Sequence, residues 1–140
     1  MKIETSRFGT LEIEREELIE FPQGMIGFAD QREYLLIDHA PGSPVHWLQS
    51  TQVPGLAFPL VDPDRFVDGY LVHPPAEMNE LLGSCEPADL WLGVVMSLPV
   101  SGRPTLNLKA PVVMNSCTRR GVQLVLDQDL PVRLPIGRQK

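Results

Sequence analysis

The residue best suited to chemistry in this chain is Cys117, which lies just before Arg119 and Arg120. Guanidinium groups close to a thiol favour the thiolate, which is the nucleophilic form of cysteine. A histidine from elsewhere in the fold could then act as its base. This pattern allows a thiol-dependent hydrolase, and the alternative is a loop cysteine without a catalytic role. The other cysteine, Cys85, is too distant for the C-x-x-C spacing of a redox or zinc motif, so we expect two free thiols.

Three histidines are the other candidates for chemistry. His39, His46 and His73, together with Asp38 or Asp62, could supply ligands for a metal ion. No two histidines have the i, i+4 spacing of a helical metal site, and no P-loop, G-x-G-x-x-G or G-x-S-x-G sequence occurs. The sequence therefore favours a protein that is not an enzyme, with no cofactor, metal or small-molecule substrate.

The length and composition are typical of one soluble domain. A chain of 140 residues is expected to form a single domain, residues 1–140. No apolar run reaches the ~18 residues of a membrane-spanning helix, and the N-terminal residues lack the apolar core of a signal peptide. We therefore expect a cytoplasmic protein that does not contact a membrane.

Charge is distributed unevenly along the chain. Residues 1–99 contain 5 Lys and Arg against 16 Asp and Glu, a net charge of −11, whereas residues 100–140 contain 7 against 2, a net charge of +5. The two parts could simply lie against each other, or the acidic part could steer a basic partner. Direct binding of nucleic acid is disfavoured, because an acidic chain without a basic stripe repels phosphate.

The elements that must position these residues are mostly strands. Strand patterns recur about every ten residues, which favours an all-β fold, a small single-domain antiparallel β-barrel-like fold with one or two short helices. Closure into a barrel would remove the exposed edges of the sheet. The pattern predicts a hairpin in residues 1–14, a helical turn from Asp62, a helix over Pro74–Leu82 that Gly83 ends, and strands at Tyr34–Ile37, Val45–Ser50, Leu56–Val61 (near an edge because of Pro59), Tyr70–Val72, Leu90–Leu98 (central), Leu106–Asn115 and Val122–Leu126.

The predicted strand Leu106–Asn115 alternates between apolar even positions and polar odd positions. Asn107 and Lys109 should then stand on its outer face, beside a proline, Pro111, that cannot donate to a ladder. The segment Phe21–Phe28 is the second unusual feature, because prolines and glycines interrupt it while its large residues are apolar. Such a loop either folds back over the core or forms a contact surface.

Three segments carry a resemblance to a known family: FPQGMIGF at Phe21–Phe28, WLQS at Trp47–Ser50 and LNLKAPVVMN at Leu106–Asn115. In order and spacing the chain resembles the FliW family of flagellar assembly factors. Leu56–Pro63 and Val132–Gly137 also fit, so the resemblance covers nearly the whole chain, most weakly over Val67–Ala88.

The resemblance implies a regulator without enzymatic activity. Proteins of this family bind flagellin and the translational repressor CsrA, and they prevent CsrA from silencing flagellin mRNA; the two partners exchange as flagellin is secreted. Flagellin has amphipathic helices that need an apolar groove, and an acidic surface suits a basic RNA-binding repressor. We predict a partner-binding surface formed by Phe21, Pro22, Met25, Ile26, Phe28, Gln49, Asn107, Lys109, Pro111 and Asn115.

Two other functions remain open at this stage. One is an oligonucleotide-binding barrel that uses Trp47, Phe28 and Lys109. The other is the Cys117-dependent enzyme described above. For Trp47 and Trp91 the alternative is a place in the core or as a plug of the barrel.

Overall fold

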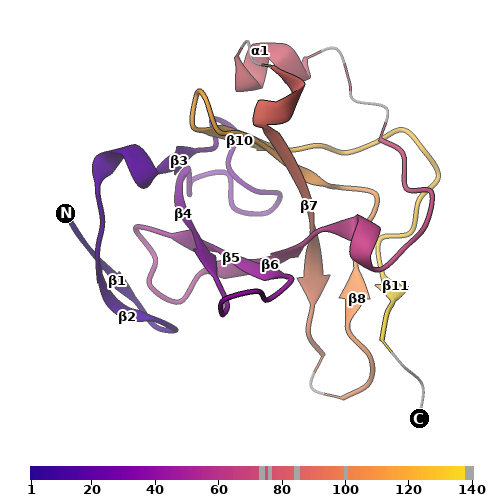
Figure 1. Cartoon of the computed structure of the whole chain (residues 1–140), viewed down its shortest axis with the longest axis horizontal. Helices are drawn as coiled ribbons and strands as arrows, with labels where there is room; N and C mark the ends of the chain where they lie inside the picture. The colour runs from indigo at the N-terminus through magenta and orange to yellow at the C-terminus, as the bar shows by residue number, and fades with distance from the viewer. Residues whose placement is uncertain (73–74, 76, 84–85, 100, 138–140) are drawn as a thin grey trace.

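The computed structural model describes residues 1–72, 75, 77–83, 86–99 and 101–137, and Figure 1 shows the chain as a mostly β structure with one α-helix. Short 3₁₀ turns cover Arg15–Glu17, Pro63–Arg65 and Pro87–Asp89, and α1 covers Met78–Leu82. The strands are β1 (Lys2–Thr5), β2 (Gly9–Glu12), β3 (Ile19–Glu20), β4 (Glu33–Asp38), β5 (Val45–Ser50), β6 (Ala57–Val61), β7 (Leu90–Ser97), β8 (Thr105–Leu106), β9 (Val112–Asn115), β10 (Arg120–Gln123) and β11 (Leu134–Pro135).

Seven strands close into a barrel, as the sequence predicts. The main sheet runs β11-β8-β7-β6-β5-β4-β3-β10-β9, and β9 pairs back with β7. The closure is antiparallel except between β3 and β10, where Arg120 and Glu20 are the only paired residues of a parallel contact. β7 is the central strand that was predicted, because it pairs with β6, β8 and β9.

Strands are buried on both faces because other elements cover the outside of the barrel. The interior cluster includes Phe21, Tyr34 and Leu48, none of which is exposed. The hairpin of β1 and β2 packs its Ile3 against Leu35 on the outer side of β4. The hairpin prediction for residues 1–14 is therefore confirmed, and its apolar residues form a second, smaller core.

α1 covers the outer side of β9 and β10. Leu82 packs with Val113 and Val122, and Gly83 ends the helix with a φ of 82° that L-residues rarely adopt. The predicted helix Pro74–Leu82 thus begins later, at Met78; Pro74 lies outside the described residues. The predicted turn at Asp62 is confirmed, with the Asp62 carboxylate accepting a 3.0 Å hydrogen bond from the amide of Asp64.

Three of the predictions about individual strands are wrong. β6 lies between β5 and β7 and is not near an edge. Its ladder with β7 begins at Leu60, so Pro59 is not required to donate there. The segment 70–72 is not a strand: the backbone carbonyl of Leu71 accepts from the side chain of Gln128 at 2.8 Å, and the Tyr70 hydroxyl ties the segment to the carbonyl of Leu108 at 2.6 Å.

The predicted strand Leu106–Asn115 is also wrong, because it is broken into β8 and β9. The Asn107 side-chain oxygen accepts hydrogen bonds from the amides of Lys109 and Ala110, each at 3.1 Å. A short polar side chain that bonds nearby amides competes with a ladder and turns the chain. Alternation of residue types concealed this turn.

Candidate functional site

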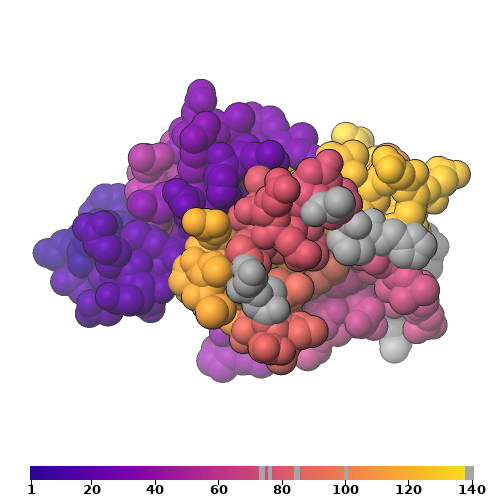
Figure 2. Space-filling model, turned by 90° about the horizontal axis from the view of Figure 1, so that it is seen from above, coloured from indigo at the N-terminus to yellow at the C-terminus, as the bar shows by residue number. Residues whose placement is uncertain are grey.

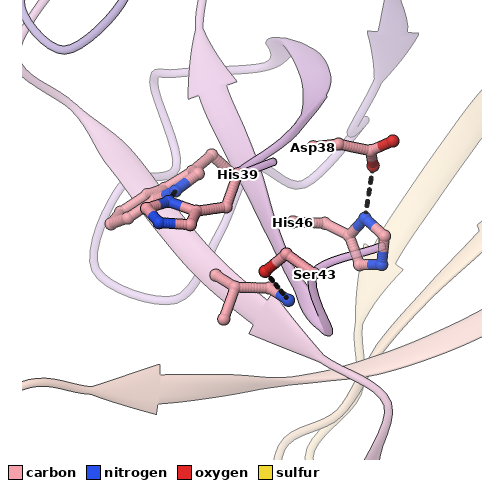
Figure 3. Close-up of polar contacts among 6 residues, drawn as sticks. Asp38, His39, Ser43 and His46 are labelled. Atoms are coloured by element: carbon pink, nitrogen blue, oxygen red, sulfur yellow. Dashed lines mark hydrogen bonds and ion pairs between the residues drawn. The ribbon is translucent and has the colours of Figure 1, made fainter. Parts of the chain in front are cut away.

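His39 and His46 do not converge on one point (Figure 3). On one side of the hairpin formed by β4 and β5, His46 Nδ1 lies 2.6 Å from a carboxylate oxygen of Asp38. On the other side, His39 Nδ1 accepts a 3.1 Å hydrogen bond from the indole of Trp47. Among the described residues no three His, Cys, Asp or Glu side chains are grouped as metal ligands would be. His73 lies outside the described residues.

The side chains with catalytic potential are not assembled into a site. Cys117 is exposed on the turn between β9 and β10, and the guanidinium of Arg119 donates to the carbonyl of Glu17 at 2.7 Å. In the described part of the chain Cys117 forms no hydrogen bond with a histidine. Burial raises the pKa of Tyr34 and of Tyr70 to about 12, so both phenols stay neutral and neither is an activated base. Cys85 lies outside the described residues.

The residues proposed for stacking or phosphate contacts are engaged within the fold. Trp47 is buried, and the guanidinium carbon of Arg7 lies 3.9 Å from the centre of its ring. The Lys109 ammonium donates to the carbonyls of Leu126 and Gln128, each at 2.9 Å. A buried ring and a bonded ammonium offer little to a base or a phosphate.

The structure divides the ten predicted contact residues by accessibility. Ile26 and Phe28 are exposed, with 55% and 41% of their surface accessible. Pro22, Asn107 and Lys109 are half-buried, and the remaining five are buried: Phe21, Met25, Gln49, Pro111 and Asn115. Partner binding by these ten residues stays a prediction, and Ile26 and Phe28 are the most accessible of them to a partner that docks on the folded chain.

Gln49 shows why a polar residue is buried. Its side-chain nitrogen lies 3.0 to 3.2 Å from the carbonyls of Ser50, Pro54 and Leu56, so the buried amide group has partners on its nitrogen. Buried polar groups are normally paired in this way. Gln49 therefore fixes the turn that follows β5.

Asn115 fixes the turn that follows β9. Its side-chain oxygen accepts from the amides of Cys117 and Thr118, and its nitrogen donates to the carbonyl of Leu82 at the end of α1. The side chains of Lys109 and Asn107 also form hydrogen bonds with backbone groups, as described above. The outer strand face predicted for them therefore does not exist.

Ile26 of the Phe21–Phe28 loop lies at a surface hollow lined by both apolar and polar residues, and Phe28 packs beside it on Phe58. The loop reverses tightly, with a bridge between Met25 and Phe28. Gly24 has a φ of 67°, and a Cβ there would lie 2.5 Å from the carbonyl oxygen of Phe28, so the reversal requires glycine. Phe28 then stacks edge to face on Phe58 of β6 with ring centres 5.4 Å apart.

The hollow has a volume of about 260 Å³ and is lined by residues from several distant parts of the chain. Gln123 connects the loop to the β9 side: its oxygen accepts from the amide of Ile26 at 2.9 Å, and its nitrogen donates to the carbonyl of Ala110 at 3.2 Å. The lining residues are Met25, Ile26, Phe58, Val95, Ser97, Asn107, Gln123, Val132 and Arg133. We name this surface the Ile26 hollow.

Sequence reasoning brought Met25, Ile26 and Asn107 to the same surface but missed Phe58, Gln123, Val132 and Arg133. Phe58 and Val132 belong to segments that carry the family resemblance, and this was the signal that could have added them. Gln123 follows from the alternation of Val122–Leu126, which turns its side chain away from its apolar neighbours.

The closed seven-stranded barrel, with its outer hairpin and one short helix, defines a small, mostly β protein. A family model described as "FliW protein" matches residues 2–136. The chain belongs to the FliW family of flagellar assembly factors, which is regulatory rather than enzymatic.

Two relatives and one solved structure illustrate this. The flagellar assembly factor FliW of Moorella thermoacetica is 40% identical over 129 residues, which cover 91% of this chain and 82% of that protein. The FliW of Bdellovibrio bacteriovorus is 36% identical over 138 residues, covering 97% and 79%. A crystal structure of the flagellar assembly factor FliW matches with a TM-score of 0.88 at 28% identity and covers 96% of both chains. Within the described residues, no helix has the length and apolar character needed to cross a bilayer.

Proposed function

We propose that this chain is a cytoplasmic regulator that binds flagellin and antagonises CsrA, so that translation of flagellin mRNA is relieved of repression. The observation that carries the proposal is the Ile26 hollow, where apolar residues from distant segments are exposed together. Within it Ile26 and Val132 are 55% and 53% accessible, and Phe28, which packs on the lining residue Phe58, is 41% accessible. An amphipathic helix binds by laying apolar side chains into such a groove, and flagellin supplies helices of this kind.

The charge of the chain supports the second partner. A repressor that binds RNA is basic where it contacts phosphate, and residues 1–99 carry a net charge of −11, from 5 basic and 16 acidic residues. The proposal does not require imitation of RNA, since contacts beside the RNA-binding surface could act indirectly.

The first experiment mixes the purified chain with flagellin and with CsrA of the same organism. Calorimetry and gel filtration should detect a complex with each partner. The absence of both complexes would refute the proposed function.

The second experiment tests the hollow. Ile26→Ser combined with Phe28→Ser should weaken flagellin binding by tenfold or more, about 1.4 kcal/mol, because central apolar residues dominate interface energies. Val53→Ser is the matched control, since Val53 is also exposed, at 38%, and lies outside the hollow. Equal binding by the double variant and the control would show that flagellin docks elsewhere.

A further inference from the structure

The outer edge of β10 is open. β10 pairs with β9 along its whole length, whereas its other side meets β3 only at Arg120. Beyond β10 the chain stays extended, because the amides of Leu124 and Leu126 donate to the carbonyls of Pro111 and Lys109 at 2.8 and 2.9 Å.

The amides of Gln123 and Val125 therefore face the other side. Successive amides of a strand point in opposite directions, so these two point away from the neighbouring chain. In the described part of the structure no acceptor is found for either amide. The edge offers two backbone donors, with their carbonyls beside them.

A second hollow, of about 530 Å³, follows this edge. Its lining includes the six consecutive residues Val122–Asp127. Side chains of an extended strand alternate between two faces, so an unbroken run can line one hollow only if the backbone edge itself is exposed. Gln23 and Leu81 of α1 also line the hollow. Figure 2 looks down on α1 and shows the β10 segment beside it.

The edge lacks the features that normally prevent pairing with another chain. Natural proteins protect edges with charges, prolines or bulges. Residues 122–126 contain neither a charge nor a proline, and Val125 is 61% exposed. The charged residues of the hollow are acidic: Glu77 and Asp127 line it, and no described lysine or arginine does.

We propose that the edge Val122–Asp127 binds an extended segment of a partner protein, which adds a strand to the sheet. The segment would place apolar residues on the α1 side, toward Leu81, and alternate them with a lysine or arginine on its other face, toward Asp127. Main-chain hydrogen bonds provide affinity in this mode, and alternate side chains provide specificity. The site is separate from the Ile26 hollow, with which it shares only Gln123, and it does not depend on the proposed function.

The test uses a blocked peptide of alternating valine and lysine, and amide hydrogen exchange followed by NMR. The amides of Gln123 and Val125 should exchange rapidly in the free chain and at least about tenfold more slowly with the peptide bound, because each gains a hydrogen bond. The same peptide with every amide N-methylated should give no protection. Slow exchange in the free chain, or equal protection by the methylated peptide, would overturn the proposal. Protection that appears with rising protein concentration alone would assign the edge to a second copy of this chain and would also overturn it.

A pair of variants tests the same site without relying on exchange. Val125→Pro removes the open amide and should weaken peptide binding about tenfold, whereas Val125→Thr keeps the amide and the branched shape and should bind within about twofold of the original chain. Equal affinities would contradict the proposal. Should Val125→Pro not fold, the exchange rates of the unmodified chain still decide. Flagellin binding should be unchanged in Val125→Pro, so a failure here is distinct from a failure of the proposed function.

Discussion

Gly121 of β10 lies against the ring of Phe21 inside the barrel. A Cβ at position 121 would lie 2.4 Å from the ring carbon Cζ, far closer than non-bonded carbons approach. Phe21 is completely buried and also stacks on Tyr34, with ring centres 5.3 Å apart, so the ring has little room to move. Glycine is thus required where the parallel contact of β3 and β10 closes the barrel.

Gly121→Ala should lower the free energy of unfolding by about 1–3 kcal/mol, because it overpacks a filled core. Gly55→Ala is the control: its Cβ would lie 3.7 Å from the Ser6 hydroxyl, an ordinary contact, and its φ is not in the left-handed region. The control should change stability by less than about 0.5 kcal/mol. Denaturant unfolding measures both, and equal losses would contradict the packing argument.

At the scale of elements, α1 depends on the turn between β9 and β10. A helix of five residues is too short to be stable alone. Its final carbonyl, that of Leu82, accepts from the Asn115 side chain at 3.1 Å and from the Thr118 hydroxyl at 2.6 Å. The turn therefore holds the C-terminal end of the helix in place.

Asn115→Ala should lower the free energy of unfolding by about 2 kcal/mol, because it removes the bond to Leu82 and leaves two turn amides without their acceptor. Amides in α1 should also exchange with solvent faster than in the unmodified chain. Ser116→Ala, at an exposed neighbouring position, is the control and should have little effect. Unchanged exchange in α1 would show that packing alone holds the helix.

Elements that depend on local signals could be predicted from the sequence. The first hairpin, the capped turn at Asp62 and the glycine that ends α1 all follow from residues within a few positions of one another. Elements that depend on distant partners could not. The turn at Asn107 interrupts an apparently regular strand, and the ammonium of Lys109 holds carbonyls 17 and 19 residues away.

The candidate site shows the same division. The composition of Phe21–Phe28 identified a loop rich in apolar residues. It did not show which of them are buried and which face solvent. Phe21 points into the core, whereas Ile26 is exposed, and a loop has no period from which this could be derived. The contact that fixes Ile26 comes from Gln123, 97 residues along the chain.

At the scale of the whole molecule, one end carries a group of exposed acidic side chains. The hairpin of β1 and β2 lies at one end of the long axis and β11 lies at the other (Figure 1). Four glutamates between positions 12 and 17 are exposed at the first end, and Arg103 donates to the carbonyls of Ile136 and Gly137 at the second. A basic partner should therefore approach the hairpin first.

Glu12→Lys combined with Glu16→Lys tests this steering. The two reversals change the net charge by +4, from −6 to −2. Glu14 and Glu17 are left intact, because their side chains cap the 3₁₀ turn between them. Stopped-flow mixing with CsrA at low salt should show association slowed several-fold with little change in dissociation, because exposed charges act mainly on the encounter.

The matched pair Glu12→Gln and Glu16→Gln, with a net charge of −4, should give an intermediate rate. The differences should shrink as salt is raised and screening shortens the range of the field. If the variants instead differ in dissociation alone, the glutamates form contacts in the complex and the steering argument fails.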